Sequence, residues 1–300
     1  MNRHWRWLLA LLASLALLAA ACGSDDGGDE TIKIGAQDFG ESAILAEIYG
    51  QVLEANGFEV EQVEVGGFRD LLLAAFESGD VNFSPEYAAS MLEFLNENAG
   101  EATGDATETV ELLQAQLDDL GLVALEPAPG VDTNAFVVTQ ETSDSEGLVA
   151  ISDIPADGGG YSLGAPQDCE TNPFCIPGLQ DVYGVDLSEG FVPLDPGVVA
   201  DTLAAGEVTI GVLFSTSGRI ADEGWVLLED DMSMLAADNI TPVLTDSLIE
   251  AHGDELVALV DSISEVITTA DLTELNRLFD IEGGDADTIA ADYIAEKGLA

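Results

Sequence analysis

The residue types that carry most enzyme chemistry are scarce in this sequence. It has two histidines and three cysteines among 300 residues, against 58 aspartates and glutamates. His252 lies near the end of a predicted helix. A lone histidine at such a position usually stabilises the helix by interacting with its dipole, and it is rarely a ligand. No cysteine or histidine cluster gives a zinc pattern, and no GxSxG, P-loop or GxGxxG segment follows a predicted strand. We therefore expect no enzyme activity, no cofactor and no metal site.

Residues 1–22 have the pattern of a secretory signal peptide. Arg3 and Arg6 form a short basic region, and an apolar run and small residues lead to Cys22. The run is too short and wrongly flanked for a spanning helix. Its ending, LAAAC, resembles a bacterial lipoprotein cleavage box, in which Cys22 is diacylated and anchors the protein to the membrane. Residues 23–30 would form a polar tether. The alternative is ordinary secretion, with Cys22 discarded or left as a thiol.

The segment CETNPFC places Cys169 and Cys175 six positions apart. In a cytosolic chain this spacing could mark a redox pair or half of a metal site. A secretory leader instead directs the chain to an oxidising compartment, and lipid attachment would use Cys22, which leaves one even pair. The sequence thus predicts a Cys169–Cys175 disulfide, whose short loop contributes about 2–3 kcal/mol of stability.

The composition describes a folded and very acidic protein. The formal net charge is −51, with 7 basic residues, so nucleic acid and anionic lipid heads are not expected partners. Hydrophobic residues make up 47% of the chain, which excludes an acidic disordered tail. Because such a charge repels itself unless counter-ions screen it, the composition suggests a salty habitat. Without repeats or a Ser/Thr-rich stalk, a structural surface role is disfavoured.

Hydrophobic periodicity predicts two sets of alternating strands and helices. In the first set, the predicted strands cover 31–34, 58–65 and 81–87, and the predicted helices cover 41–57, 69–78, 88–98 and 109–120. In the second set, the strands cover 134–139, 161–165, 191–194 and 208–213, and the helices cover 176–183 and 197–205. The chain returns through strands at 226–229 and 240–244 and helices at 246–253, 255–269, 272–280 and 286–297.

This alternation is typical of α/β lobes with mostly parallel sheets. We predict two lobes joined by two crossings, near 132–134 and 236–239. Residues 31–133 plus 237–300 would form lobe 1, and residues 134–236 would form lobe 2.

Four segments, in order, resemble a known family. They are KIGAQDFGESAILAEIYGQVLEANGFEVE, ESGDVNFSPEYAAS, LGAPQDCETNPFCIPGLQDVYGVDL and AAGEVTIGVLFSTSGRIADEGWVLLEDD. The sequence is similar to the substrate-binding proteins of ABC importers for glycine betaine, choline and related osmolytes. The resemblance implies a type II periplasmic-binding-protein-like clamshell outside the cell membrane. It also implies a monomer that delivers a quaternary ammonium ligand to an ABC permease driven by an ATPase.

A quaternary ammonium group is held by aromatic faces, through cation–π attraction and desolvation. The resemblance places Tyr87 of the intact PEY motif in such a cage, with Ser90 three positions later. Phe214 stands where the family has a tyrosine, and Thr216 follows it. At the first crossing, the family's common tyrosine is Asn134, with Asp132 two residues before it. Tyr87 could instead be a packed tyrosine, Phe214 a core residue and Asn134 a turn residue.

Other departures from the family concern the ligand's carboxylate end. Gln37 replaces the usual lysine, Asn172 replaces the usual arginine of the cysteine loop, and Ala200 takes the place of an aromatic residue. Amides bind a carboxylate less strongly than cations do. Arg219 could restore the lost charge, although a surface or hinge salt bridge is the alternative, and Asn172 could be a turn residue.

We therefore predict a solute receptor whose ligand is nearer to choline than to glycine betaine, with Asp132 supplying negative charge. The alternatives are a receptor for another small cation or amino acid and, with less support, a secreted hydrolase.

Overall fold

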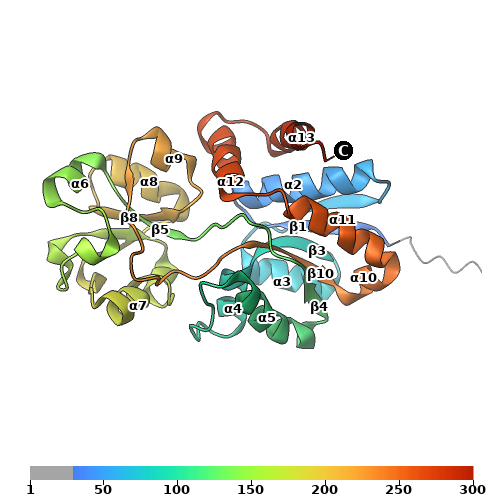
Figure 1. Ribbon diagram of the computed structural model, residues 1–300, viewed down its shortest axis with the longest axis horizontal. Coiled ribbons are helices and arrows are strands. Elements are labelled where there is room, and N and C mark those ends of the chain that lie inside the picture. The colour runs from blue at the N-terminus through green and yellow to red at the C-terminus, as the bar shows by residue number, and fades with distance from the viewer. Residues whose placement is uncertain (1–29, 300) are drawn as a thin grey trace, which may run out of the picture.

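The protein consists of two α/β lobes that lie side by side (Figure 1). The computed structural model describes residues 30–299, so the predicted leader, Cys22 and most of the tether lie outside the described residues. Each lobe contains one five-stranded sheet. We call the lobe with the first sheet lobe 1 and the other lobe 2. Segments 125–133 and 228–239 run between the sheets, which confirms the predicted two-lobed α/β fold.

The sheet of lobe 1 is mixed. Its strands are β1 (Ile32–Ala36), β2 (Val60–Glu64), β3 (Phe83–Tyr87), β4 (Leu122–Ala124) and β10 (Ile240–Thr245), in the order β2-β1-β3-β10-β4. The pairs that β1 makes with β2 and β3 are parallel. The returning strand β10 is antiparallel to both β3 and β4, and it places the end of the second crossing beside the end of β3.

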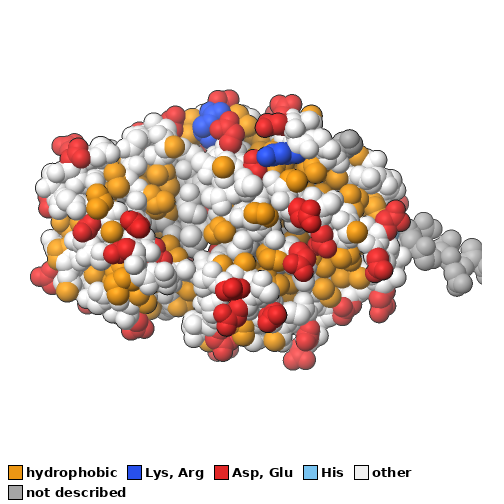
Figure 2. Space-filling model, in the orientation of Figure 1, with side chains coloured by type: hydrophobic (Ala, Val, Ile, Leu, Met, Phe, Trp, Pro, Cys, Tyr) orange, Lys and Arg blue, Asp and Glu red, His pale blue; other side chains and the backbone are white. Residues whose placement is uncertain are grey.

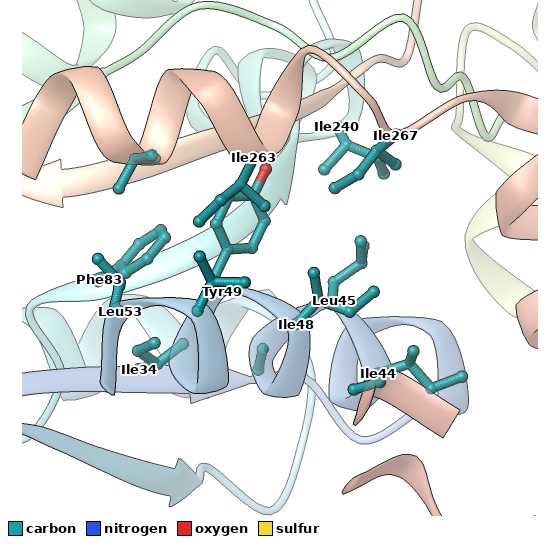
Figure 3. Packing of buried hydrophobic residues seen from close by; sticks show 14 of the residues in the cluster. Ile34, Ile44, Leu45, Ile48, Tyr49, Leu53, Phe83, Ile240, Ile263 and Ile267 are labelled. Carbon is teal, nitrogen blue, oxygen red and sulfur yellow. The ribbon is translucent and has the colours of Figure 1, made fainter. Parts of the chain in front are cut away.

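Helices cover both faces of this sheet. They are α2 (Gly40–Ala55), α3 (Arg69–Ser78), α4 (Ala88–Leu95), α5 (Ala106–Leu117), α10 (Asp246–His252), α11 (Asp254–Ser264), α12 (Thr269–Asn276) and α13 (Ala286–Lys297). The helices α2, α11 and α13 lie on one side, and α3 to α5 lie on the other (Figure 1). In Figure 3, Tyr49 of α2 lies between Phe83 and Ile263, and its hydroxyl is 2.9 Å from Ser264 Oγ. This packing holds the middle of α2 against the core of lobe 1.

Lobe 2 repeats the layered design with shorter elements. Its strands are β5 (Asn134–Val138), β6 (Leu163–Ala165), β7 (Phe191–Pro193), β8 (Ile210–Phe214) and β9 (Val226–Leu227), in the order β7-β6-β8-β5-β9. Its helices are α6 (Gln140–Glu146), α7 (Ile176–Gly178), α8 (Pro196–Ala204) and α9 (Gly218–Asp222). Side chains of β5 alternate, as a strand requires. Phe136 packs with the α7 side, and Val137 packs with α8.

The two crossings are bonded to each other. The backbone N–H of Asp132 donates to the carbonyl of Asp238 over 3.1 Å, and Val131 and Asn239 form an antiparallel bridge. The crossings thus run side by side, and each brings one aspartate to the place where the lobes meet.

Several short elements differ from the predictions. The strand β4 and the helices α6 and α9 were not predicted, because three to seven residues are too few to establish a hydrophobic period. The helix predicted over 176–183 is α7 followed by a turn of π-helix, Leu179–Tyr183. The helix predicted over 272–280 is part of α12 followed by a second π-turn, Arg277–Ile281. Within residues 30–299, no helix has the length and apolar character needed to cross a bilayer.

Acidic side chains are distributed over both lobes on the face shown in Figure 2. Basic side chains are few on that face, as the composition requires.

Candidate ligand-binding site

Candidate residues of both lobes follow the carboxyl ends of strands. Gln37 follows β1, Tyr87 ends β3, and Phe214 ends β8. In open α/β sheets, ligands bind outside the carboxyl ends of the parallel strands. Phe214 also lies opposite Asn134 in the pairing of β8 with β5, beside the first crossing. The two sheets therefore bring these residues together where the lobes meet.

Three aromatic rings gather at this place. The ring of Phe39 has its centroid 5.9 Å from that of Tyr87 and 6.0 Å from that of Phe214, against which it is stacked. We call Phe39, Tyr87 and Phe214 the aromatic group. Phe214 is 44% exposed, which excludes the core alternative, whereas Tyr87 is 4% exposed. Sequence reasoning missed Phe39, although it lies two residues after Gln37 in the same loop.

A buried carboxylate connects the aromatic group to the opposite lobe. Glu41, in the first turn of α2, accepts a hydrogen bond from the Tyr87 hydroxyl at 2.7 Å. Its other oxygen accepts from the Thr216 hydroxyl at 2.8 Å and from the Asn276 amide at 2.5 Å. Thr216 was a predicted site residue, and its hydroxyl contacts Glu41. Glu41 and Asn276 were not predicted.

The two crossings contribute two further buried acids. Asp132 accepts from the backbone N–H of Thr216 at 3.2 Å and from the Ser215 hydroxyl at 3.3 Å. Asp238 accepts from the backbone N–H of Ser90 at 3.0 Å and from its hydroxyl at 2.5 Å. Ser90 and Asp132 were predicted site residues, whereas Asp238 was not. We call Glu41, Asp132 and Asp238 the buried acidic group.

The protein environment raises the pKa of all three carboxyls. Burial is the largest effect and raises the pKa of Glu41. The hydrogen bonds that Glu41 accepts lower its pKa in part, and the charge of Asp238 raises it further. Burial and then the charge of Glu41 raise the pKa of Asp132 well above its usual value. Burial raises the pKa of Asp238 to about 6 against its hydrogen bonds to Ser90. The three carboxyls therefore do not readily ionise at the same time, because a negative charge on one disfavours the ionised form of the others.

The nearest cation is already neutralised. Arg69 binds Glu86 through Nη2 at 2.8 Å and through Nε at 3.2 Å to each carboxylate oxygen. The Gln37 amide also donates to Glu86, at 3.2 Å. Among residues 30–299, the other basic side chains, Lys33, Arg219, Arg277 and Lys297, bond elsewhere. Against the effect of burial, the charge of Arg69 lowers the pKa of Asp238, but no basic side chain among residues 30–299 forms an ion pair with the buried acidic group.

The disulfide loop adjoins the site through Asn134. Cys169 and Cys175 are joined as predicted, with their Cα atoms 5.1 Å apart. The side-chain amide of Asn134 donates to the carbonyl of Phe174 in this loop, at 3.2 Å. The oxygen of the Asn172 side chain accepts from the backbone N–H of Phe174 at 2.8 Å, so Asn172 has the role of a turn residue in this structure.

Other candidate residues lie apart from this arrangement. Ala200 belongs to α8 and is buried in the core of lobe 2. Arg219 forms ion pairs with Asp201 and Glu223, which agrees with the salt-bridge alternative. His252 ends α10, where its ring bonds the carbonyl of Glu30 and packs against Phe58.

A surface pocket and a metal site are the two other kinds of site to consider among the described residues. A surface groove of about 470 Å³ between β2 and α3 contains none of the predicted site residues. Residues 30–299 hold no cluster of three or more histidine, cysteine or acidic side chains arranged to bind a metal.

Comparisons with known proteins agree with this geometry. Residues 30–296 match the family described as the substrate binding domain of the ABC-type glycine betaine transport system. The chain belongs to this family. The predicted family is thus confirmed, and it is a family of transport proteins that bind substrates outside the cytoplasm rather than of known enzymes.

Relatives of this substrate-binding protein share its full length. A glycine-betaine-binding protein of Pseudomonas aeruginosa is 29% identical, over 100% of this chain and 96% of the relative. The glycine betaine-binding protein YehZ of Escherichia coli (strain K12) is 26% identical, over 98% and 97%. A crystal structure of a glycine betaine/carnitine/choline ABC transporter superposes with a TM-score of 0.76 at 23% identity, over 89% of this chain and 99% of that one. That structure supports the fold of this substrate-binding protein.

Proposed function

We propose that this substrate-binding protein captures a small quaternary ammonium cation between its lobes and delivers it to an ABC permease driven by an ATPase. The ligand is nearer to choline than to glycine betaine. The observation that carries this proposal is the buried acidic group beside the aromatic group, without a free cation among the described residues. A receptor for another small cation or an amino acid is the alternative.

The aromatic group suits the quaternary ammonium of such a ligand. A quaternary ammonium ion donates no hydrogen bonds and favours the faces of aromatic rings. Two rings, Phe39 and Tyr87, belong to lobe 1, and Phe214 belongs to lobe 2, so only the closed form offers all three. Because the ligand then favours that form, binding selects closure.

The negative charge of the site should make it bind choline more tightly than glycine betaine. Both ligands carry the quaternary ammonium, but glycine betaine also carries a carboxylate. That carboxylate would lie near Glu41, Asp132 and Asp238, and the guanidinium of Arg69 is committed to Glu86. Each of these carboxyls that is ionised repels the betaine carboxylate strongly where water is excluded, and a bound cation favours their ionised form. The choline hydroxyl is neutral and meets no such repulsion. Gln37, Ser90, Asn134 and Thr216 remain the proposed polar contacts, with Asn172 as the proposed loop contact.

The remaining parts of the proposal concern location and organisation. Residues 1–22 act as a signal peptide, Cys22 carries the lipid anchor, and 23–30 form the tether at the outer face of the cell membrane. Residues 31–133 plus 237–300 form lobe 1, residues 134–236 form lobe 2, and the protein acts as a monomer. The sequence pattern of the leader and the family membership support this arrangement.

Calorimetric titration with choline and with glycine betaine tests the ligand assignment. We expect choline to bind more tightly, and tighter binding of glycine betaine would overturn the assignment. Parallel thermal-shift arms with ectoine and amino acids test the alternative, because a bound ligand raises the unfolding temperature.

A pair of variants tests the charge argument. Asp132→Asn should weaken choline binding at least tenfold, which corresponds to about 1.4 kcal/mol. Asp292→Asn removes one charge from an exposed position and should leave choline affinity unchanged. Equal effects of the two substitutions would show that the net charge, not the site, attracts the ligand.

A further inference from the structure

We propose that Glu41 is a positioning residue that couples ligand capture to closure of the lobes. It holds Tyr87 of the aromatic group and, only when the lobes are in contact, Thr216 of the opposite lobe. This inference rests on the proposed function of the same site and identifies how that site senses closure.

The hydrogen bonds of Glu41 come from three separate parts of the chain. Tyr87 ends β3 in lobe 1, Thr216 follows β8 in lobe 2, and Asn276 ends α12, which packs against α2. The Asn276 amide also donates to the hydroxyl of Thr216 at 3.0 Å and to its carbonyl at 3.2 Å. One carboxylate therefore joins a ring of the aromatic group to a contact between the lobes.

Close backbone packing surrounds this network. The helix α9 of lobe 2 contacts α12 and the π-turn that follows it (Figure 1). At Gly218, an added Cβ would lie 2.7 Å from both Cα and Cβ of Arg277 and 3.0 Å from its backbone nitrogen. Only glycine allows so close an approach. We call Glu41, Thr216, Gly218, Asn276 and Arg277 the clasp.

The clasp gives closure a defined end point. A hydrogen bond to a buried carboxylate is stronger than one between neutral groups, and the bond from Thr216 to Glu41 can form only at the distance that Gly218 permits. In that position the Tyr87 hydroxyl is held by Glu41, so the ring cannot turn away from Phe39. Ligand contact with Tyr87 and contact between the lobes thus stabilise the same conformation.

Two variants disturb the clasp in different ways. Gly218→Ala forces the lobes apart without changing a polar group, and Thr216→Val removes the lobe-spanning hydroxyl. Each should weaken choline binding about tenfold, mainly through faster dissociation, because encounter with the open form is unchanged. Gly197→Ala is the matched control in the same lobe, since its added Cβ meets nothing within 4 Å. It should bind as the wild type does.

A third variant separates position from charge. In Glu41→Gln, the amide oxygen can still accept from Thr216 and Asn276, while the amide group donates to the Tyr87 oxygen. We expect dissociation to remain slow, while the dependence of choline affinity on pH becomes weaker, because the substitution removes a carboxyl group whose pKa is raised by burial. A purely structural glutamate would alter stability without changing that pH profile.

Stopped-flow mixing with choline, followed by fluorescence of Trp225, measures these rates. Trp225 lies beside α9, under the guanidinium of Arg219, and is the only tryptophan after residue 7. Faster dissociation in Gly218→Ala and Thr216→Val, with unchanged unfolding temperatures without ligand, supports the inference. Wild-type dissociation rates in both variants overturn it.

The outcome remains informative if the wild type binds no choline. In that case the proposed ligand is wrong, and small-angle X-ray scattering tests the clasp alone. The inference commits to closed lobes in a measurable fraction of the ligand-free protein. Gly218→Ala should then have a larger radius of gyration than the wild type and Gly197→Ala, and equal radii overturn the inference.

Discussion

Replacing Asp238 with Asn should stabilise the protein at neutral pH and leave its stability unchanged near pH 4. Asp238 is buried, and its pKa is raised from 3.8 to about 6. Between these two values the folded protein binds a proton that the unfolded chain has released. The free energy of unfolding therefore falls as the pH rises from about 4 to about 6, and the loss is complete above that range.

The size of the effect follows from the pKa shift. A rise to about 6 corresponds to about 3 kcal/mol at neutral pH, at 1.36 kcal/mol per pKa unit. Asn can keep both contacts with Ser90, because its oxygen can accept from the backbone N–H and its amide can donate to the hydroxyl. The substitution therefore removes the charge with little change in shape.

Urea unfolding at pH 4, 5, 6 and 7.5 measures this effect. The stability difference between Asp238→Asn and the wild type should grow from near zero at pH 4 to at most about 3 kcal/mol at pH 7.5. Asp292→Asn, which removes an exposed charge, controls for the overall acidity of the chain. Parallel curves for the wild type and Asp238→Asn would refute the reasoning. The same variant should bind choline less tightly, since the charge that destabilises the fold attracts the ligand.

Three further predictions concern the aromatic group, the disulfide and the acidic surface. Phe39→Ala should weaken choline binding roughly threefold to thirtyfold in calorimetric titration, whereas Phe39→Tyr, which keeps the ring, should bind within a fewfold of the wild type; equal losses would argue against a ring contact. Cys169→Ser should lower the free energy of unfolding by about 2–3 kcal/mol, and a reducing agent should then have no further effect on it. The thermal midpoint should rise between low and molar salt, and a flat or falling midpoint would contradict a fold limited by self-repulsion.

The fold was predictable where elements are long enough to show a period. The helix α2 presents Ile44, Ile48 and Val52 to the sheet at helical spacing, and its predicted range differs from the observed one by only one or two residues. The antiparallel position of β10 between β3 and β4 could not be inferred in the same way. That pairing joins segments more than a hundred residues apart, and the apolar pattern of a buried strand does not specify its neighbours.

The candidate site was predictable only in part for a similar reason. Tyr87 and Phe214 were found through family segments, but Glu41 and Asp238 were not. The partners of Glu41, Thr216 and Asn276, lie 175 and 235 residues away in the chain. One glutamate among 58 acidic residues has no local pattern that marks it as buried. Only the tertiary structure distinguishes it from the solvated ones.

The pairing of the two crossings has a consequence for how such receptors diverge. Because Asp132 donates its backbone N–H to the carbonyl of Asp238, a one-residue insertion in either crossing would move one aspartate out of register with the other. Lineages should therefore preserve the lengths of both crossings while surface loops vary. When a substitution changes the charge at one of these positions, we expect a compensating substitution at the other. The crossings and the ligand preference should therefore change together.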